Sequence, residues 1–147
     1  MAIPTGPVTA STDAERAMFD FVDAYDRAYE NAALEHGLSV AQACVLGRLA
    51  RQVGMRELAD ELGCDASNVT QIISRLEARG LVRRQPHPDD RRSRQIVRTP
   101  EGALLYAAFE KSFEFARSAA ANLTAREQDQ LTALLRKALH GPRDPDA

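Results

Sequence analysis

A run of polar side chains between residues 67 and 75 has the chemistry needed to contact the edges of nucleic-acid bases. Its members carry hydroxyl, carboxamide or guanidinium groups: Ser67, Asn68, Thr70, Gln71, Ser74 and Arg75. A carboxamide can form paired hydrogen bonds with adenine, and a guanidinium can do so with guanine. Apolar residues at the intervening positions indicate that these polar side chains share the exposed face of one helix. The alternative is an ordinary solvated helix face.

Arginines are concentrated in the segment that follows. Residues 75–98 contain eight arginines and three acidic residues, a net charge of +5, whereas the rest of the chain carries −7. A localised basic surface on an acidic body is typical of a protein that binds a polyanion. A guanidinium also suits the narrow minor groove of A·T-rich DNA, where the negative potential is enhanced. We expect contacts from Arg84, Arg91, Arg92 and Arg94, and solvated loop charges are the alternative.

A helix-turn-helix followed by a β-hairpin would hold these side chains together. Helices are expected over 55–62 and 66–79, joined by a turn that contains Gly63. Alternating residues over 81–85 and 94–98 predict two short strands around a loop rich in Pro and Asp. A hairpin directly after the second helix of a helix-turn-helix is a wing. This arrangement would bring the arginines close to the polar helix face.

Further helices are expected over 12–35, 39–52, 100–121 and 125–139. Capping-box sequences begin at Thr12, Ser39 and Thr124, and Thr99 precedes a proline. The first and the last two of these helices carry apolar stripes that a small winged module cannot cover, which predicts burial against a second copy of the chain.

The predicted fold is mainly α with a small β-wing. A winged helix-turn-helix core over about 39–99 would be flanked by dimerisation helices over about 12–36 and 100–140. The length of 147 residues fits one domain, over 12–140, between disordered tails at 1–11 and 141–147.

The motifs between residues 57 and 102 resemble those of the MarR family of multiple-antibiotic-resistance-type transcriptional regulators. They are Glu57-Leu58-Ala59, Val69-Thr70, the string from Arg75 to Arg84, Asp89-Asp90-Arg91-Arg92 and Thr99-Pro100-Glu101-Gly102. The resemblance covers about residues 12–140. It implies a homodimer, usually a repressor, whose two recognition helices enter successive major grooves of a pseudo-palindromic operator. It also implies that Arg92 is the arginine at the wing tip and that Asp90 is its orienting carboxylate.

Arg98 departs from the family pattern. An apolar residue usually precedes the Thr of the Thr-x-x-Gly motif, and this chain has Arg98 there. We expect an extra phosphate contact or a local ion pair at this position.

The resemblance further implies a phenolic or aromatic-acid effector, bound in a crevice between the dimerisation helices and the winged lobe. Four residues are available near that crevice: Tyr25, Tyr29, His36 and Arg48. The alternative is core or dimer packing for the tyrosines and solvent exposure for His36 and Arg48. An effector would release the protein from DNA only by its differential affinity for two states of the dimer.

The two cysteines indicate neither a disulfide framework nor a zinc site, because no CxxC or suitably spaced histidine accompanies them. Cys44 is expected to be a buried small hydrophobe. Cys64 precedes a helix whose positive end could lower the thiol pKa, so an oxidant-sensing regulator using Cys64 is an alternative function. Another alternative is a winged-helix protein-interaction module whose arginines bind an acidic protein. Steep salt dependence and a preference for duplex DNA would argue against that module.

The motif inventory does not support an enzyme. The chain has no Gly-rich phosphate loop, no His-Glu-x-x-His and no Gly-x-Ser-x-Gly, and its three histidines lie in separate segments. We therefore expect no catalytic residue, no cofactor and no metal. We also expect a soluble cytoplasmic protein without a membrane partner, because the chain lacks a signal-peptide pattern and a long apolar run. The expected partners are double-stranded DNA and a second copy of the chain.

Overall fold

The computed structural model describes residues 8–141, which form two compact units. The first unit ends at Phe113, and the second begins at Glu114. The predicted tails lie mostly outside the described residues, at 1–7 and 142–147. Ser11 is described and takes part in the start of the first helix, because its backbone N–H donates to the Glu15 carboxylate.

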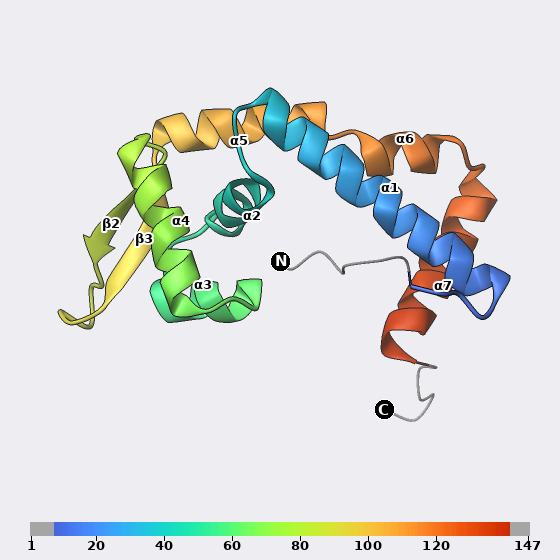
Figure 1. Cartoon of the computed structure of the whole chain (residues 1–147), viewed down its shortest axis with the longest axis horizontal. Coiled ribbons are helices and arrows are strands. Elements are labelled where there is room, and N and C mark those ends of the chain that lie inside the picture. Colours follow the sequence, from blue (N-terminus) through green and yellow to red (C-terminus); the bar gives the residue numbers. More distant parts are fainter. Residues whose placement is uncertain (1–7, 142–147) are drawn as a thin grey trace. The chain divides into compact units, whose positions relative to one another are not determined.

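The first unit contains five helices and three strands (Figure 1). In chain order they are α1 (Asp13–Glu35), α2 (Val40–Arg48), β1 (Val53–Gly54), α3 (Met55–Leu62), α4 (Ala66–Ala78), β2 (Val82–Pro86), β3 (Arg94–Arg98) and α5 (Pro100–Ser112). The second unit contains α6 (Phe115–Ala121) and α7 (Ala125–His140). The fold is therefore mainly helical with a small antiparallel sheet, as predicted.

Side-chain caps begin the helices at the predicted positions. Thr12, Ser39 and Thr124 each accept a hydrogen bond from a backbone N–H three residues later, and the side chain there reaches back to the cap. Thr99 caps α5, with Pro100 at its first position. Both interactions satisfy backbone groups that the first turn of a helix leaves unpaired.

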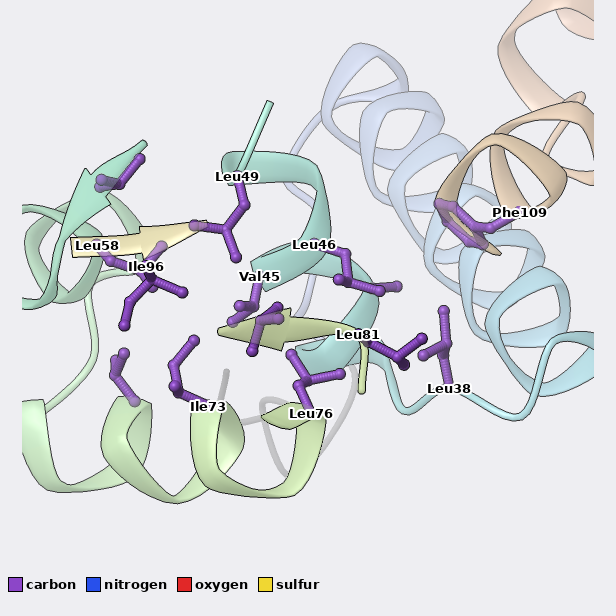
Figure 2. Close-up of a cluster of buried hydrophobic side chains, with 14 of the residues drawn as sticks. Leu38, Val45, Leu46, Leu49, Leu58, Ile73, Leu76, Leu81, Ile96 and Phe109 are labelled. Carbon is purple, nitrogen blue, oxygen red and sulfur yellow. The ribbon is translucent and has the colours of Figure 1, made fainter. Parts of the chain in front are cut away.

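The core of the first unit lies where α2, α3 and α4 pack with the sheet (Figure 2). Leu46, Leu58, Ile73 and Ile96 from these four elements are fully buried. Phe109 of α5 and two alanines of α1 extend the same cluster. Because the apolar side of α4 is buried here, its polar side is left at the surface.

The sheet has three strands, in the order β1-β3-β2, and the sequence had predicted only two. Val53 of β1 lies opposite Ile96 of β3 and is fully buried. The prediction of one helix over 39–52 is wrong in its last part, because α2 ends at Arg48 and the chain then leads into β1 at Val53. Pairing with the middle strand and burial of Val53 account for the extended conformation of β1.

The predicted helix over 100–121 is also interrupted. Phe113 leaves the helical region, with a ψ of 83°, although it is neither glycine nor proline. Its ring packs edge-on against Tyr25 and Tyr29 of α1, with ring centroids 5.2 Å apart in both pairs. Tertiary packing of this ring, and not a local helix breaker, accounts for the end of α5.

The second unit is a pair of helices whose connecting turn is held by side-chain hydrogen bonds. Gln128 donates from its side chain to the backbone carbonyls of Ala120 and Leu123. The helix α7 has no buried residue. Its apolar stripe is exposed by 40 to 77% at Leu131, Leu134, Leu135 and Leu139. Within residues 8–141 no helix is both long and apolar enough to cross a membrane.

Candidate nucleic-acid interface

The predicted helix-turn-helix is formed by α3 and α4. Gly63 ends α3 in the left-handed conformation with a φ of +60°, where glycine has no steric penalty. The next backbone N–H, that of Cys64, returns to the Ala59 carbonyl. The chain then enters α4 at Ala66. The turn therefore depends on Gly63 at the position that the sequence indicated.

The six polar residues predicted on α4 are all exposed. Two of them already have hydrogen bonds, because Thr70 donates to the Ala66 carbonyl and Ser74 accepts from Arg84. Within residues 8–141, Asn68, Gln71 and Arg75 have no side-chain hydrogen bond or ion pair. These three side chains keep their donors and acceptors available for a ligand.

The predicted wing is the hairpin of β2 and β3, which Figure 1 shows beside α4. At its tip the Ser93 N–H donates to the Asp90 carbonyl, and the Asp90 carboxylate accepts from the Arg92 N–H at 2.9 Å. Asp90 thus acts on the backbone of Arg92 in this structure. Arg91, Arg92 and Arg94 are exposed, and none of them is ion-paired within the described part of the chain.

Arg84 differs from the other wing arginines. Its Nη1 lies 2.8 Å from a Glu77 carboxylate oxygen, and its Nη2 donates to the Ser74 hydroxyl at 3.0 Å. The Arg84 backbone N–H also donates to Glu77. Although the sequence grouped Arg84 with the exposed wing contacts, its guanidinium is already bound to α4. Its neighbour Arg83 is the exposed member of the pair.

Arg98 is tied into the root of the wing and forms no ion pair with any described residue. Its Nη1 donates to the Leu46 carbonyl at 3.2 Å, and its guanidinium carbon lies 5.1 Å from the centroid of the Tyr106 ring. The predicted local ion pair is therefore wrong. The guanidinium links α2 and α5 to β3, while the aliphatic stem supplies the packing that an apolar residue would give.

The Thr-x-x-Gly motif anchors α5 to the same root. The Thr99 hydroxyl donates to the Gly80 carbonyl at 2.6 Å and accepts from the Gly102 N–H at 3.0 Å. A Cβ at Gly102 would overlap the backbone carbonyl oxygen of Leu81. Glycine is required here because the first turn of α5 lies directly against the backbone that leads into β2.

Three of the four predicted effector residues contact the C-terminal part of α5. Tyr25 and Tyr29 stack with ring centroids 6.2 Å apart, and Tyr29 meets Phe109 edge-on at 5.0 Å. The His36 Nε2 lies 2.9 Å from the Ser112 hydroxyl. The fourth residue, Arg48, is exposed on α2.

Burial and a hydrogen bond with Cys44 raise the pKa of the Tyr29 phenol well above its ordinary value. Cys44 is half-buried, which agrees with a packing role. Cys64 is also half-buried, and its thiol donates to the Leu62 carbonyl at 3.4 Å. Among the residues that the structure describes, no cluster of three His, Cys, Asp or Glu side chains could hold a metal ion.

Sequence comparison identifies relatives of this chain. A family model described as MarR family matches residues 36–93, which run from the end of α1 to the wing tip. The HTH-type transcriptional regulator PecS of Dickeya dadantii is 31% identical over 116 residues, which cover 75% of this chain and 70% of PecS.

Structural comparison finds the same architecture in solved proteins. Wild-type MarR from E. coli in its apo form matches with a TM-score of 0.73 and 26% identity, over 91% of this chain and 99% of that protein. A mutant MarR from E. coli, complexed with operator DNA, matches with a TM-score of 0.69 and 28% identity. That match covers 85% of this chain and 92% of the mutant.

Proposed function

This chain belongs to the MarR family, and we propose that it is a sequence-specific DNA-binding regulator of transcription that acts by binding and not by catalysis. The observation that carries the proposal is the exposed face of α4, on which Asn68, Gln71 and Arg75 keep their polar groups available beside an arginine-rich wing tip. In this proposal α4 lies in the major groove. The two carboxamides contact adenine, and Arg75 contacts guanine or a phosphate.

The wing tip supplies the second contact with the duplex. Arg91, Arg92 and Arg94 are exposed and form no ion pair with a described residue. Arg92 enters the minor groove, where narrow A·T-rich DNA attracts a guanidinium. Asp90 holds the turn that presents Arg92. Arg84 acts differently, since its bonds to Glu77 and Ser74 support a role in orienting the wing against α4.

A homodimer supports two such contacts at once. In the first unit α1 exposes Met18, Phe21 and Val22 by about half of their surface, and in the second unit α7 exposes its leucine stripe. Apolar faces of this kind are usual where two copies of a chain associate. Two recognition helices about 34 to 36 Å apart would then enter successive major grooves of a pseudo-palindromic operator.

Repression and its release complete the proposal. The bound dimer blocks transcription, and a phenolic or aromatic-acid effector near Tyr25, Tyr29, His36 and Arg48 favours a different separation of the recognition helices. The contacts of the first three residues with the C-terminal end of α5 support this location, because α5 is also anchored to the wing root through Thr99. The effector shifts the equilibrium only by its differential affinity for the two states.

Fluorescence anisotropy tests the proposed function. The purified chain is titrated against a labelled duplex from the intergenic region upstream of its own gene, with a scrambled duplex as control, at two salt concentrations. We expect a preference for the native duplex of about 10³-fold or more and a steep loss of affinity with salt. Equal, weak binding to both duplexes would contradict specific recognition of that region. Absence of binding to either would favour the protein-interaction alternative.

A further inference from the structure

A hollow of about 310 Å³ lies at the root of the wing. It is lined by the segment between α2 and β1 and by the strands β2 and β3: Leu49, Ala50, Arg51, Gln52, Arg83, Gln85, Val97 and Arg98. Its volume is at the lower end of the range for small-molecule pockets. The lining contains none of the residues proposed above to contact DNA: Asn68, Gln71, Arg75, Arg91, Arg92 and Arg94.

The hollow opens on the side of the sheet that faces away from α4. Successive side chains of a strand point to opposite faces, and Arg84 points to α4, where it binds Glu77. Its neighbours Arg83 and Gln85 therefore project from the other face. Val97 lies opposite Arg83 in the ladder and shares that face. A ligand in the hollow would not compete with DNA for the exposed side of α4.

The lining is cationic, and much of its charge is not offset. It contains three arginines and two glutamines but no acidic residue. Arg51 is neutralised by Glu57 and Glu61, each at 2.7 Å. Arg83 and Arg98, in contrast, form no ion pair within residues 8–141. Guanidinium groups match the paired oxygens of carboxylates and phosphates, and the glutamine side chains supply further N–H donors.

We propose that this hollow binds a small oxyanion ligand that carries a phosphate group or more than one carboxylate. Arg83 is the principal contact, because it is exposed and its guanidinium has no acidic partner among the described residues. Arg98 is the less direct neighbour, because it lies opposite Val82 in the ladder and its guanidinium is held by the Leu46 carbonyl and the Tyr106 ring. The ligand joins the segment before β1 to the outer face of the wing. The site does not depend on the proposed DNA-binding function, because it lies on a different face of the sheet.

Isothermal titration calorimetry of the full chain without DNA tests the site. Inorganic phosphate and succinate are the probes, and sodium chloride of matched ionic strength is the reference. We expect saturable binding of at least one probe by the wild-type protein. Arg83→Gln is expected to weaken it about tenfold or more, because a charge-assisted hydrogen bond is lost. Arg83→Lys keeps the positive charge but not the planar guanidinium with its paired N–H donors, so its loss of binding affinity is expected to be smaller than that of Arg83→Gln.

The matched control is Arg136→Gln, which removes an exposed arginine of α7 outside the lining and is expected to bind the probes like the wild type. Circular dichroism checks that each variant is folded. The absence of saturable binding, or equal binding by Arg83→Gln and the wild type, would overturn the proposal. A backbone phosphate of DNA could supply the same oxyanion to Arg83 as a small ligand. If Arg83→Gln weakens duplex binding while the wild type binds neither probe, the hollow takes DNA and the small-ligand site is wrong.

Discussion

Arg84 of the wing and Glu77 of α4 form an ion pair, with 2.8 Å between Nη1 and a carboxylate oxygen, that joins the two parts of the interface. Both side chains remain about one third exposed, so the pair contributes at most about 1 kcal/mol to stability. Its consequence is geometric, since a second bond from Arg84 reaches Ser74. The wing root is held against α4, while Arg91, Arg92 and Arg94 near its tip form no ion pair with a described residue.

Replacing Arg92 with alanine is expected to weaken duplex binding, and most strongly where the minor groove is narrow and A·T-rich. The reason is the loss of one cation from the contact with the DNA backbone and minor groove. The slope of log K against log salt is expected to become less steep by about 1. Anisotropy titrations at several salt concentrations measure both quantities. Arg136→Ala, which changes an exposed arginine of α7, is the matched control. A slope identical to that of the wild type would remove Arg92 from the interface.

Gln71→Ala is expected to reduce sequence preference and leave the salt slope unchanged. The carboxamide is exposed on α4 without a partner among the described residues, and a bidentate contact with a base contributes about 1–3 kcal/mol of discrimination. Competition between native and scrambled duplexes measures the ratio of affinities. Gln130→Ala on α7 is the control for loss of an exposed glutamine. Equal weakening on both duplexes would show that Gln71 does not read a base.

Gly102→Ala is expected to destabilise the first unit by more than about 2 kcal/mol. The new methyl group would overlap the Leu81 carbonyl oxygen, and a backbone atom cannot move aside as a flexible side chain can. Urea unfolding followed by circular dichroism measures the free energy. Gly54→Ala is the matched control, because a Cβ there meets nothing within 4 Å. That variant is expected to lose less than about 1 kcal/mol. Equal stability of the two variants would argue against the close approach at Gly102.

Stability is expected to fall as the pH rises above the ordinary phenol pKa of 10.0, partly because of Tyr29. Burial raises the Tyr29 pKa, so the folded protein keeps a proton that the unfolded chain releases. The stabilisation is complete below the unfolded pKa and is lost as the pH rises towards the folded one. Burial also raises the Tyr106 pKa, so Tyr29→Phe should flatten the decline without abolishing it. Urea unfolding between about pH 9 and 11 measures the slope, and an unchanged slope in Tyr29→Phe would contradict this role.

The local elements of the fold could be predicted because their determinants are close together in the chain. Thr12, Ser39 and Thr124 cap their helices through partners three residues away. Gly63 closes the turn of the helix-turn-helix by its own backbone conformation. The exposed polar face of α4 follows from helical periodicity alone, since burial of Val69, Ile73 and Leu76 turns the intervening residues outward.

Contacts between distant residues account for the features that could not be predicted. Val53 forms a strand because Ile96 pairs with it, and Phe113 ends α5 where its ring meets Tyr25 and Tyr29. The same applies to Arg98, whose hydrogen-bond acceptor lies 52 residues earlier in the chain.

Arginines that look alike in the sequence thereby acquire different roles in the folded protein. The helices, the turn and the polar face of α4 are specified by neighbouring residues, so the order of amino acids is enough to predict them. Arg84 and Arg98 are bound within the fold, whereas Arg91 and Arg92 remain available to a ligand. The partner of Arg98 lies 52 residues away in the chain, and the partners of Arg84 lie on α4, 7 and 10 residues before it. Packing of the wing against the helices therefore makes the distinction, because it brings these partners within bonding distance.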